Sequence, residues 1–133
     1  MEKLLILLLL MVSTNVFAEW YLVGKYQNND SSYIDINSVN RIDNISNVWE
    51  LILYRKQEIS GTTGRSFQSS KGLISIDCTE EKVNLLEFFV YDSTDGTGSI
   101  VNDPFKESLP TKKIHVVPGT MYHKIMKIVC DKK

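Results

Sequence analysis

The sequence predicts an α+β domain in which a C-terminal helix is tied to a β-hairpin by a disulfide bond. Residues 73–78 and 83–91 are apolar runs joined by a polar break, which is the pattern of a hairpin. Residues 121–130 carry apolar side chains at helical spacing. The two cysteines, Cys78 and Cys130, stand at the end of the first run and inside the helix, so a bond between them would hold the helix against the hairpin.

The N-terminal segment has the pattern of a signal peptide that is cleaved after Ala18. Lys3 supplies a positive start, residues 4–12 are apolar, and Val16 and Ala18 suit a small-residue cleavage site. The apolar run is about nine residues, whereas a membrane-spanning helix needs roughly 20, and the alternative is a buried N-terminal helix. We expect residues 1–18 to be removed and residues 19–133 to form one domain without a transmembrane segment.

Charge and cysteine content narrow the class of protein. The formal net charge is −1, which argues against nucleic acid as a partner because binding phosphates requires a basic surface. Two cysteines in an exported chain predict one disulfide, and the alternative is a pair of free thiols in a reducing compartment. Closing a loop of about 50 residues would stabilise the fold by roughly 4 kcal/mol. The residue directly after the cleavage site is Glu19 and not the cysteine that a lipoprotein needs, so we expect a periplasmic or extracellular protein that is not a lipoprotein.

Further strands are expected on both sides of a polar, glycine-containing loop at residues 56–65. Strands at residues 19–27, 31–36 and 48–55 precede it, with Glu50 the single interruption of an apolar stretch. A strand at residues 66–78 follows it, and residues 99–101 and 114–117 are candidates for short strands. Asn37 or Ser38 is expected to cap a single helical turn between the second and third strands.

The terminal helix is expected to begin after Pro118, with Gly119 or Thr120 as its cap. Its spacing predicts a buried stripe on one side, with His123, Lys124 and Lys127 facing away. The residues expected on this stripe are Tyr122, Met126, Val129 and Cys130.

These features together resemble the surface-adhesin protein E family. The resemblance covers nearly all of residues 19–130 and rests on the order and spacing of short motifs. The motifs are Glu19-Trp20 at the start of a strand, Tyr33-Ile34-Asp35 before a turn, the strand from Trp49 to Tyr54, Ile76-Asp77-Cys78 at the end of a strand, and Pro118-Gly119-Thr120 opening a helix that ends in Val129-Cys130.

The resemblance implies an antiparallel sheet of about six strands with the C-terminal helix packed across it and tied by the disulfide. It also implies an exported, non-enzymatic binding protein of a Gram-negative cell envelope. Members of the family bind host matrix and plasma proteins, and lipid-anchored members display the domain on the outer membrane. The chain departs from those members because it has no lipobox cysteine. The resemblance implies no particular ligand-binding residue.

The sequence predicts no catalytic site, no metal site and no cofactor. Glu50 and Glu87 interrupt two apolar strands and are interpreted as outward-facing, the alternative being a carboxylate pair capable of acid–base chemistry. Residues 92–96 carry aspartates as in a calcium loop but lack its later glutamate, which favours a plain turn. His115 and His123 lack a convergent set of metal ligands. Residues 60–64 lack the Lys-Ser/Thr ending of a phosphate loop.

Three functions remain in view: a binding or adhesion module, a periplasmic envelope-maintenance or inhibitor-like protein, and a hydrolase with an unrecognised site. Loops 56–69 and 92–113 are candidate contact regions, because exposed loops on a rigid sheet commonly carry binding residues. The helix can cover only one face of the sheet. The other face must be closed by curvature, by residues 102–117, by a protein partner or by a second copy of the chain.

Overall fold

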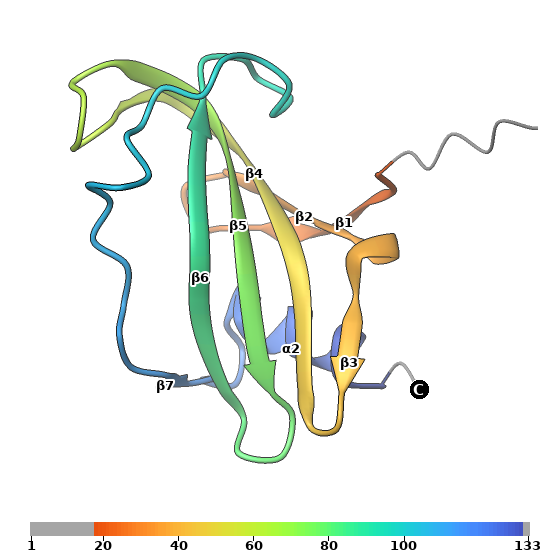
Figure 1. The fold of residues 1–133 in the computed structure, drawn as a ribbon. Coiled ribbons are helices and arrows are strands. Elements are labelled where there is room, and N and C mark those ends of the chain that lie inside the picture. Colours follow the sequence, from red (N-terminus) through yellow and green to blue (C-terminus); the bar gives the residue numbers. More distant parts are fainter. Residues whose placement is uncertain (1–17, 132–133) are drawn as a thin grey trace, which may run out of the picture.

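The structure is a computed structural model that describes residues 18–131, so the predicted signal peptide lies outside it apart from Ala18. The described residues form one antiparallel sheet and one α-helix, α2 (Figure 1). The strands run in the order β1-β2-β4-β5-β6-β7, and β3 pairs with β4 beside this path. Their bounds are β1 Trp20–Lys25, β2 Ser31–Asp35, β3 Asn40–Ile42, β4 Ile45–Ile59, β5 Ser66–Asp77, β6 Lys82–Tyr91 and β7 Ile114–His115, and α2 spans Met121–Asp131.

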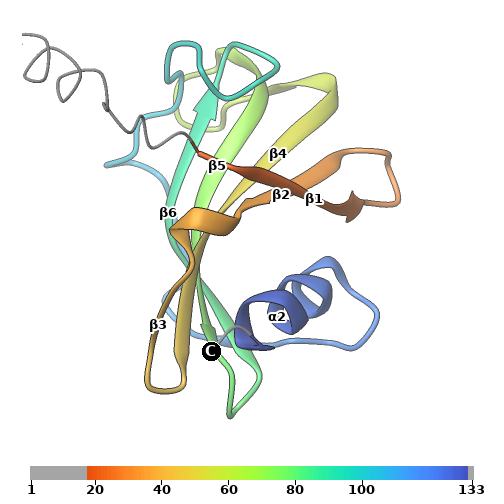
Figure 2. The same cartoon turned by 90° about the vertical axis from the view of Figure 1, so that its right-hand side faces the viewer.

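The sheet is strongly curved, and α2 lies on its inner side. Figure 2 shows β1 and β2 leaving the plane of β4, β5 and β6 and extending over the same side as the helix. This side is called the helix face below, and the opposite side is the open face. The predicted antiparallel sheet of about six strands, with a C-terminal helix packed across it, is confirmed.

The core lies between α2 and the helix face of the sheet. Alternate residues of β4 and β5 point into it, as expected for a strand with one covered face. The helix contributes Met121, Ile125, Met126 and Val129, which differs from the predicted stripe because Tyr122 and Cys130 lie at its edges, half-buried. The strands contribute the fully buried apolar side chains Ile34, Val48, Ile74 and Ile76 to this core.

Both ends of α2 are held by groups from other segments. Thr120 caps the start, because its Oγ1 accepts a hydrogen bond from the backbone N–H of His123. At the other end, Arg41 Nη1 donates to the carbonyl of Cys130, and Ser46 Oγ donates to that of Val129 at 3.2 Å. Donors at this end satisfy carbonyl groups that have no partner inside the helix.

The disulfide joins the same end of the helix to the tip of the central hairpin. Cys78 and Cys130 are bonded, with their Cα atoms 5.7 Å apart. Cys78 stands one residue beyond β5, where the strand has passed the core, so the bond lies at the rim of the helix–sheet interface. The predicted clamp is therefore part of the fold.

Several predicted boundaries differ from the structure. β4 continues to Ile59 and pairs with the start of β5, so the loop expected at residues 56–65 is confined to residues 60–65. β3 was not predicted. The short helical turn Ile36–Ser38 is capped by Asp35, not by Asn37 or Ser38, because Asp35 Oδ1 accepts from the backbone N–H of Asn37. Residues 99–101 make only an isolated bridge between Ile100 and Tyr91.

β6 carries an extra residue that changes which side chains share a face. Its register against β5 shifts between Leu73 and Ile74, so Leu86 is left without a partner. The helix face therefore holds Leu85 together with Phe88 and Val90, whereas strict alternation would place Leu85 on the open face.

One stretch of the outer edge of β6, at residues 88–90, is occupied by an amide side chain. Asn102 Oδ1 accepts from the backbone N–H of Val90, and its Nδ2 donates to the carbonyl of Phe88, both at 3.0 Å. Asn102 is buried and makes the two hydrogen bonds that a neighbouring strand would otherwise make.

We predict that replacing Cys130 with Ser lowers the free energy of unfolding by about 2–5 kcal/mol, because the 52-residue separation leaves a long loop unclosed. Urea unfolding under non-reducing conditions measures this. The wild-type protein treated with a reductant is the control and should unfold at the same urea concentration as the variant. Two reactive thiols in the unfolded, unreduced wild type would contradict the bond.

Candidate binding surfaces

The open face of the sheet is rich in aromatic side chains. Directly paired residues point to the same side of a sheet, so the register places Tyr33, Leu51, Lys71 and Phe89 in one row across four strands. Trp49, Leu73 and Glu87 form the next row. We define the aromatic face by the side chains Trp20, Tyr33, Trp49, Lys71, Leu73, Phe89 and Tyr91, all of which are half-buried.

The aromatic face is ordered by contacts among its own side chains. Trp49 stacks on Phe89 with ring centroids 6.3 Å apart. Lys71 Nζ lies 5.7 Å from the centroid of Trp20 and 5.2 Å from that of Tyr91. A cation between two aromatic rings is attracted to both. The face is therefore a preformed apolar surface with one positive charge near its centre.

Only one end of the aromatic face is covered by the described chain. Residues 92–99 fold over Leu51, which is 4% exposed, and bring Gly96 against it. A Cβ on Gly96 would lie 2.8 Å from Leu51 Cδ1, and its φ of +72° also favours glycine. Residues 102–117 were the other segment that could have covered this face. They reach the helix side of the sheet instead, where Pro110, Lys112 and Ile114 border a small cavity.

Parts of the two predicted contact loops, residues 56–69 and 92–113, are tied down by internal hydrogen bonds. In residues 92–99, Asp95 Oδ1 accepts from the N–H and hydroxyl of Thr97, and Asp92 Oδ1 accepts from the N–H of Ser99. Such bonds make the segment a self-supported turn. In residues 60–65, Thr63 Oγ1 donates to the carbonyl of Val101 at 2.6 Å, which ties the hairpin loop to the neighbouring segment.

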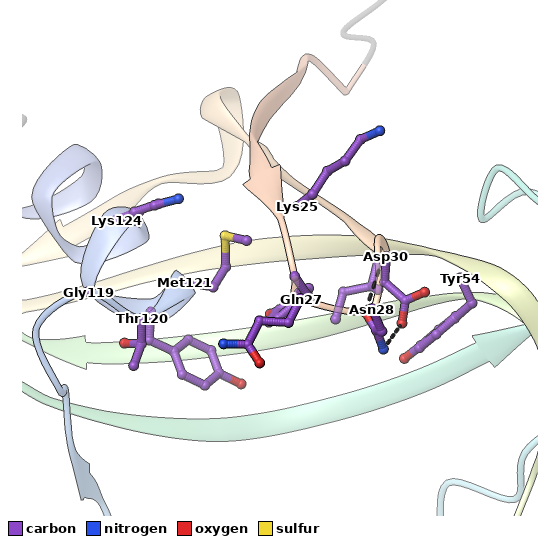
Figure 3. Close-up of a pocket in the computed structure, with 12 residues that line it drawn as sticks. Lys25, Gln27, Asn28, Asp30, Tyr54, Gly119, Thr120, Met121 and Lys124 are labelled. Carbon is purple, nitrogen blue, oxygen red and sulfur yellow. Dashed lines mark hydrogen bonds between the residues drawn. The ribbon is translucent and has the colours of Figure 1, made fainter.

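A cavity of about 810 Å³ opens on the helix face, where the sheet extends beyond the start of α2. Its walls come from three places: the β1–β2 connection, β4 and the first turn of the helix. Figure 3 shows Lys25 and Lys124 on one side of it and Asp30 and Tyr54 at another. Its remaining lining includes Tyr26, Ile52, Met121 and Tyr122.

Glu50 lies buried beside this cavity, so the prediction that it faces outward was wrong. It is 4% exposed, and its Oε2 accepts hydrogen bonds from Tyr26 Oη at 3.0 Å and Ser32 Oγ at 2.5 Å. Glu87 is exposed and pairs with Leu73, which places it on the open face. The two carboxylates thus point to opposite sides of the sheet and form no pair.

The groups around Glu50 favour their neutral forms. Burial raises the pKa of Glu50 above its usual 4.5, and the bonds from Ser32 and Tyr26 oppose this only in part. Burial also raises the pKa of Tyr122 to about 12, with the nearby Glu50 as the second cause. The pKa values of Tyr26 and Tyr54 are raised chiefly by burial as well. Burial therefore favours the protonated, neutral forms of Glu50 and of the tyrosines beside it.

Neither histidine belongs to the aromatic face or to the lining of the cavity. His115 ends the short edge strand β7, and His123 Nδ1 accepts a hydrogen bond from the N–H of Gly119 at the start of the helix. Within residues 18–131, no three His, Cys, Asp or Glu side chains converge as they would around a metal ion. No helix in this same part of the chain has the length and apolar character needed to cross a membrane.

These features define the class of domain: a curved antiparallel sheet with one terminal helix tied to it by a disulfide and an aromatic face on the other side. The family model for surface-adhesin protein E matches residues 20–131, and the chain belongs to this family.

Solved structures with a similar fold come from protein E of Haemophilus influenzae. One crystal form has a TM-score of 0.66 at 16% identity, over 88% of this chain and 91% of that chain. Another structure of the same protein has a TM-score of 0.62 at 18% identity, over 88% of this chain and 87% of that chain. No curated protein matches the sequence significantly.

We predict that Glu50→Gln removes a pH dependence of stability. An acid whose pKa is raised by folding keeps its proton in the folded state while the unfolded chain releases it, so stability falls as pH rises above about 4.5. The glutamine cannot ionise, and its oxygen can still accept from Ser32. Between pH 4 and pH 8, the urea midpoint of the wild type should therefore fall relative to that of the variant. Parallel pH profiles would contradict the assignment.

Proposed function

We propose that this protein is an exported, non-enzymatic binding module that presents its aromatic face to a protein partner. The observation that carries the proposal is the clustering of five aromatic rings around Lys71 on the face opposite the helix. Aromatic side chains are enriched in the centres of protein interfaces, where they bury a large area at little cost in conformational entropy.

Family membership supports the adhesin role and the choice of partner. The proposed partners are host matrix or plasma proteins, which is the activity that gives the family its name. An envelope protein is the alternative partner if the chain stays in the periplasm. The predicted signal peptide at residues 1–18 supports export in either case, and residues 19–133 would be the mature domain.

Location separates these two partners. We expect the mature domain on intact cells to be accessible to added protease, as a surface adhesin requires. Release by osmotic shock, together with protection from external protease, would favour the periplasmic role. Neither result affects the assignment of the aromatic face as the contact surface.

We predict that Phe89→Ser weakens binding to an immobilised matrix protein by at least about tenfold, which corresponds to ~1.4 kcal/mol. Phe89 is half-buried and stacked on Trp49, so its loss opens the centre of the face. Phe105→Ser is the matched control, because Phe105 is 99% exposed and lies in the segment after the Asn102 edge. Surface plasmon resonance on both variants, with circular dichroism to check folding, measures the difference.

Equal weakening in the two variants, or none, would refute the aromatic face as the contact surface. Sedimentation velocity of the wild type at micromolar concentration measures whether the protein is a monomer or a homodimer. A second copy of the chain could occupy the same face, in which case Phe89→Ser would shift a homodimer toward the monomer.

A further inference from the structure

We propose that the cavity on the helix face binds an anionic amphiphile, a molecule with one carboxylate and an apolar body. This site is separate from the aromatic face, which lies on the other side of the sheet. The proposal rests on three features of the cavity: its size and apolar wall, two rim lysines that form no ion pair within residues 18–131, and carboxylates that already accept hydrogen bonds from the protein.

The size and wall of the cavity suit a small molecule with an apolar body. A volume of about 810 Å³ falls within the ~300–1,000 Å³ range of ligand sites in proteins. Ile52 and Met121 supply aliphatic surface, and Tyr26, Tyr54 and Tyr122 supply aromatic surface. The wall combines a strand with the first turn of a helix, both held in place by the core.

The rim carries two positive charges. Lys25 ends β1, and Lys124 stands one turn into α2, so the two rim lysines belong to different elements. Figure 3 shows the side chain of Lys25 extending away from the other lining residues. Lys124 Nζ reaches back over β1: a Cβ added to Gly24 would lie 3.4 Å from it. Within residues 18–131 neither lysine forms an ion pair, although three other lysines do. The carboxylate of a bound ligand would supply the ion-pair partner of these lysines.

The acidic groups near the cavity do not oppose an anion strongly. Asp30 accepts from Asn28 Nδ2 and from the backbone N–H of Arg55, both at 2.9 Å. Glu50 is bonded to Tyr26 and Ser32, and its burial favours the protonated form. The first turn of α2 adds backbone N–H groups and the positive end of the helix dipole on the same side as Lys124. The charged side chains of the lining are then two lysines and one aspartate, which leaves it with a net positive charge.

The experiment is a calorimetric titration of the residue 19–133 domain with decanoate, and with decyltrimethylammonium as a cation with the same chain. We expect saturable binding of decanoate and at least tenfold weaker binding of the cation. Lys124→Gln should weaken decanoate binding about two- to fivefold, the range for loss of one exposed charge contact. Lys127→Gln is the matched control, because Lys127 is exposed on the same helix and does not line the cavity.

A second variant locates the apolar body. Ile52→Trp would fill the cavity from β4 and should abolish decanoate binding, with circular dichroism and the urea midpoint as checks on folding. If that variant does not fold, the comparison of Lys124→Gln with Lys127→Gln decides alone. Absence of saturable decanoate binding, equal binding of the two amphiphiles, or equal effects of the two lysine variants would overturn the proposal. Phe89→Ser should leave decanoate binding unchanged, which separates this site from the aromatic face.

Discussion

One short helix has to close one face of a much wider sheet, and the rest of the structure depends on that mismatch. α2 has 11 residues and is about 16 Å long. The six strands of the main path, spaced about 4.8 Å apart, span about 24 Å. The disulfide and the bonds from Arg41 and Ser46 hold the last turn of the helix near the end of β5. The uncovered part of the helix face therefore lies beside the first turn, where the cavity opens. No α-helix of residues 18–131 lies on the opposite face.

The parts of the fold that were predictable from sequence are those with strong local patterns. The hairpin of residues 73–91, the terminal helix and the two cysteines each carry a signal within a few residues. β3 has only three residues, Asn-Arg-Ile, and pairs through backbone bonds that leave no pattern. The end of β4, Lys-Gln-Glu-Ile, is polar because it is exposed, so it resembled a loop although it pairs with β5. The bulge at Leu86 reverses the faces of β6, and a single bulged residue has no distinctive sequence signature.

The candidate sites were harder to predict because each combines strands that are distant in sequence. Glu50 was expected to face outward because it interrupts an apolar run. One feature of the sequence favours a buried Glu50. Ser32 lies two residues before Ile34 and so faces the core with it, and β2 is the neighbour of β4, which brings Ser32 within hydrogen-bonding distance of Glu50. The cavity draws on residues 25–30, β4 and residues 119–124, and no local pattern joins these three segments. The aromatic face likewise becomes visible only once the register of five strands is known.

The side chain of Asn102 has a consequence for how these molecules can assemble. Strand pairing between molecules needs a free edge on each of them, and growth beyond two copies needs two free edges per molecule. On the β6 side, one amide occupies the backbone groups of Phe88 and Val90, and β7 offers only two residues. The β1 side retains the longer unpaired edge. Within residues 18–131, pairing between two chains through β1 therefore meets no such side-chain block, whereas a strand approaching β6 must first displace the amide of Asn102.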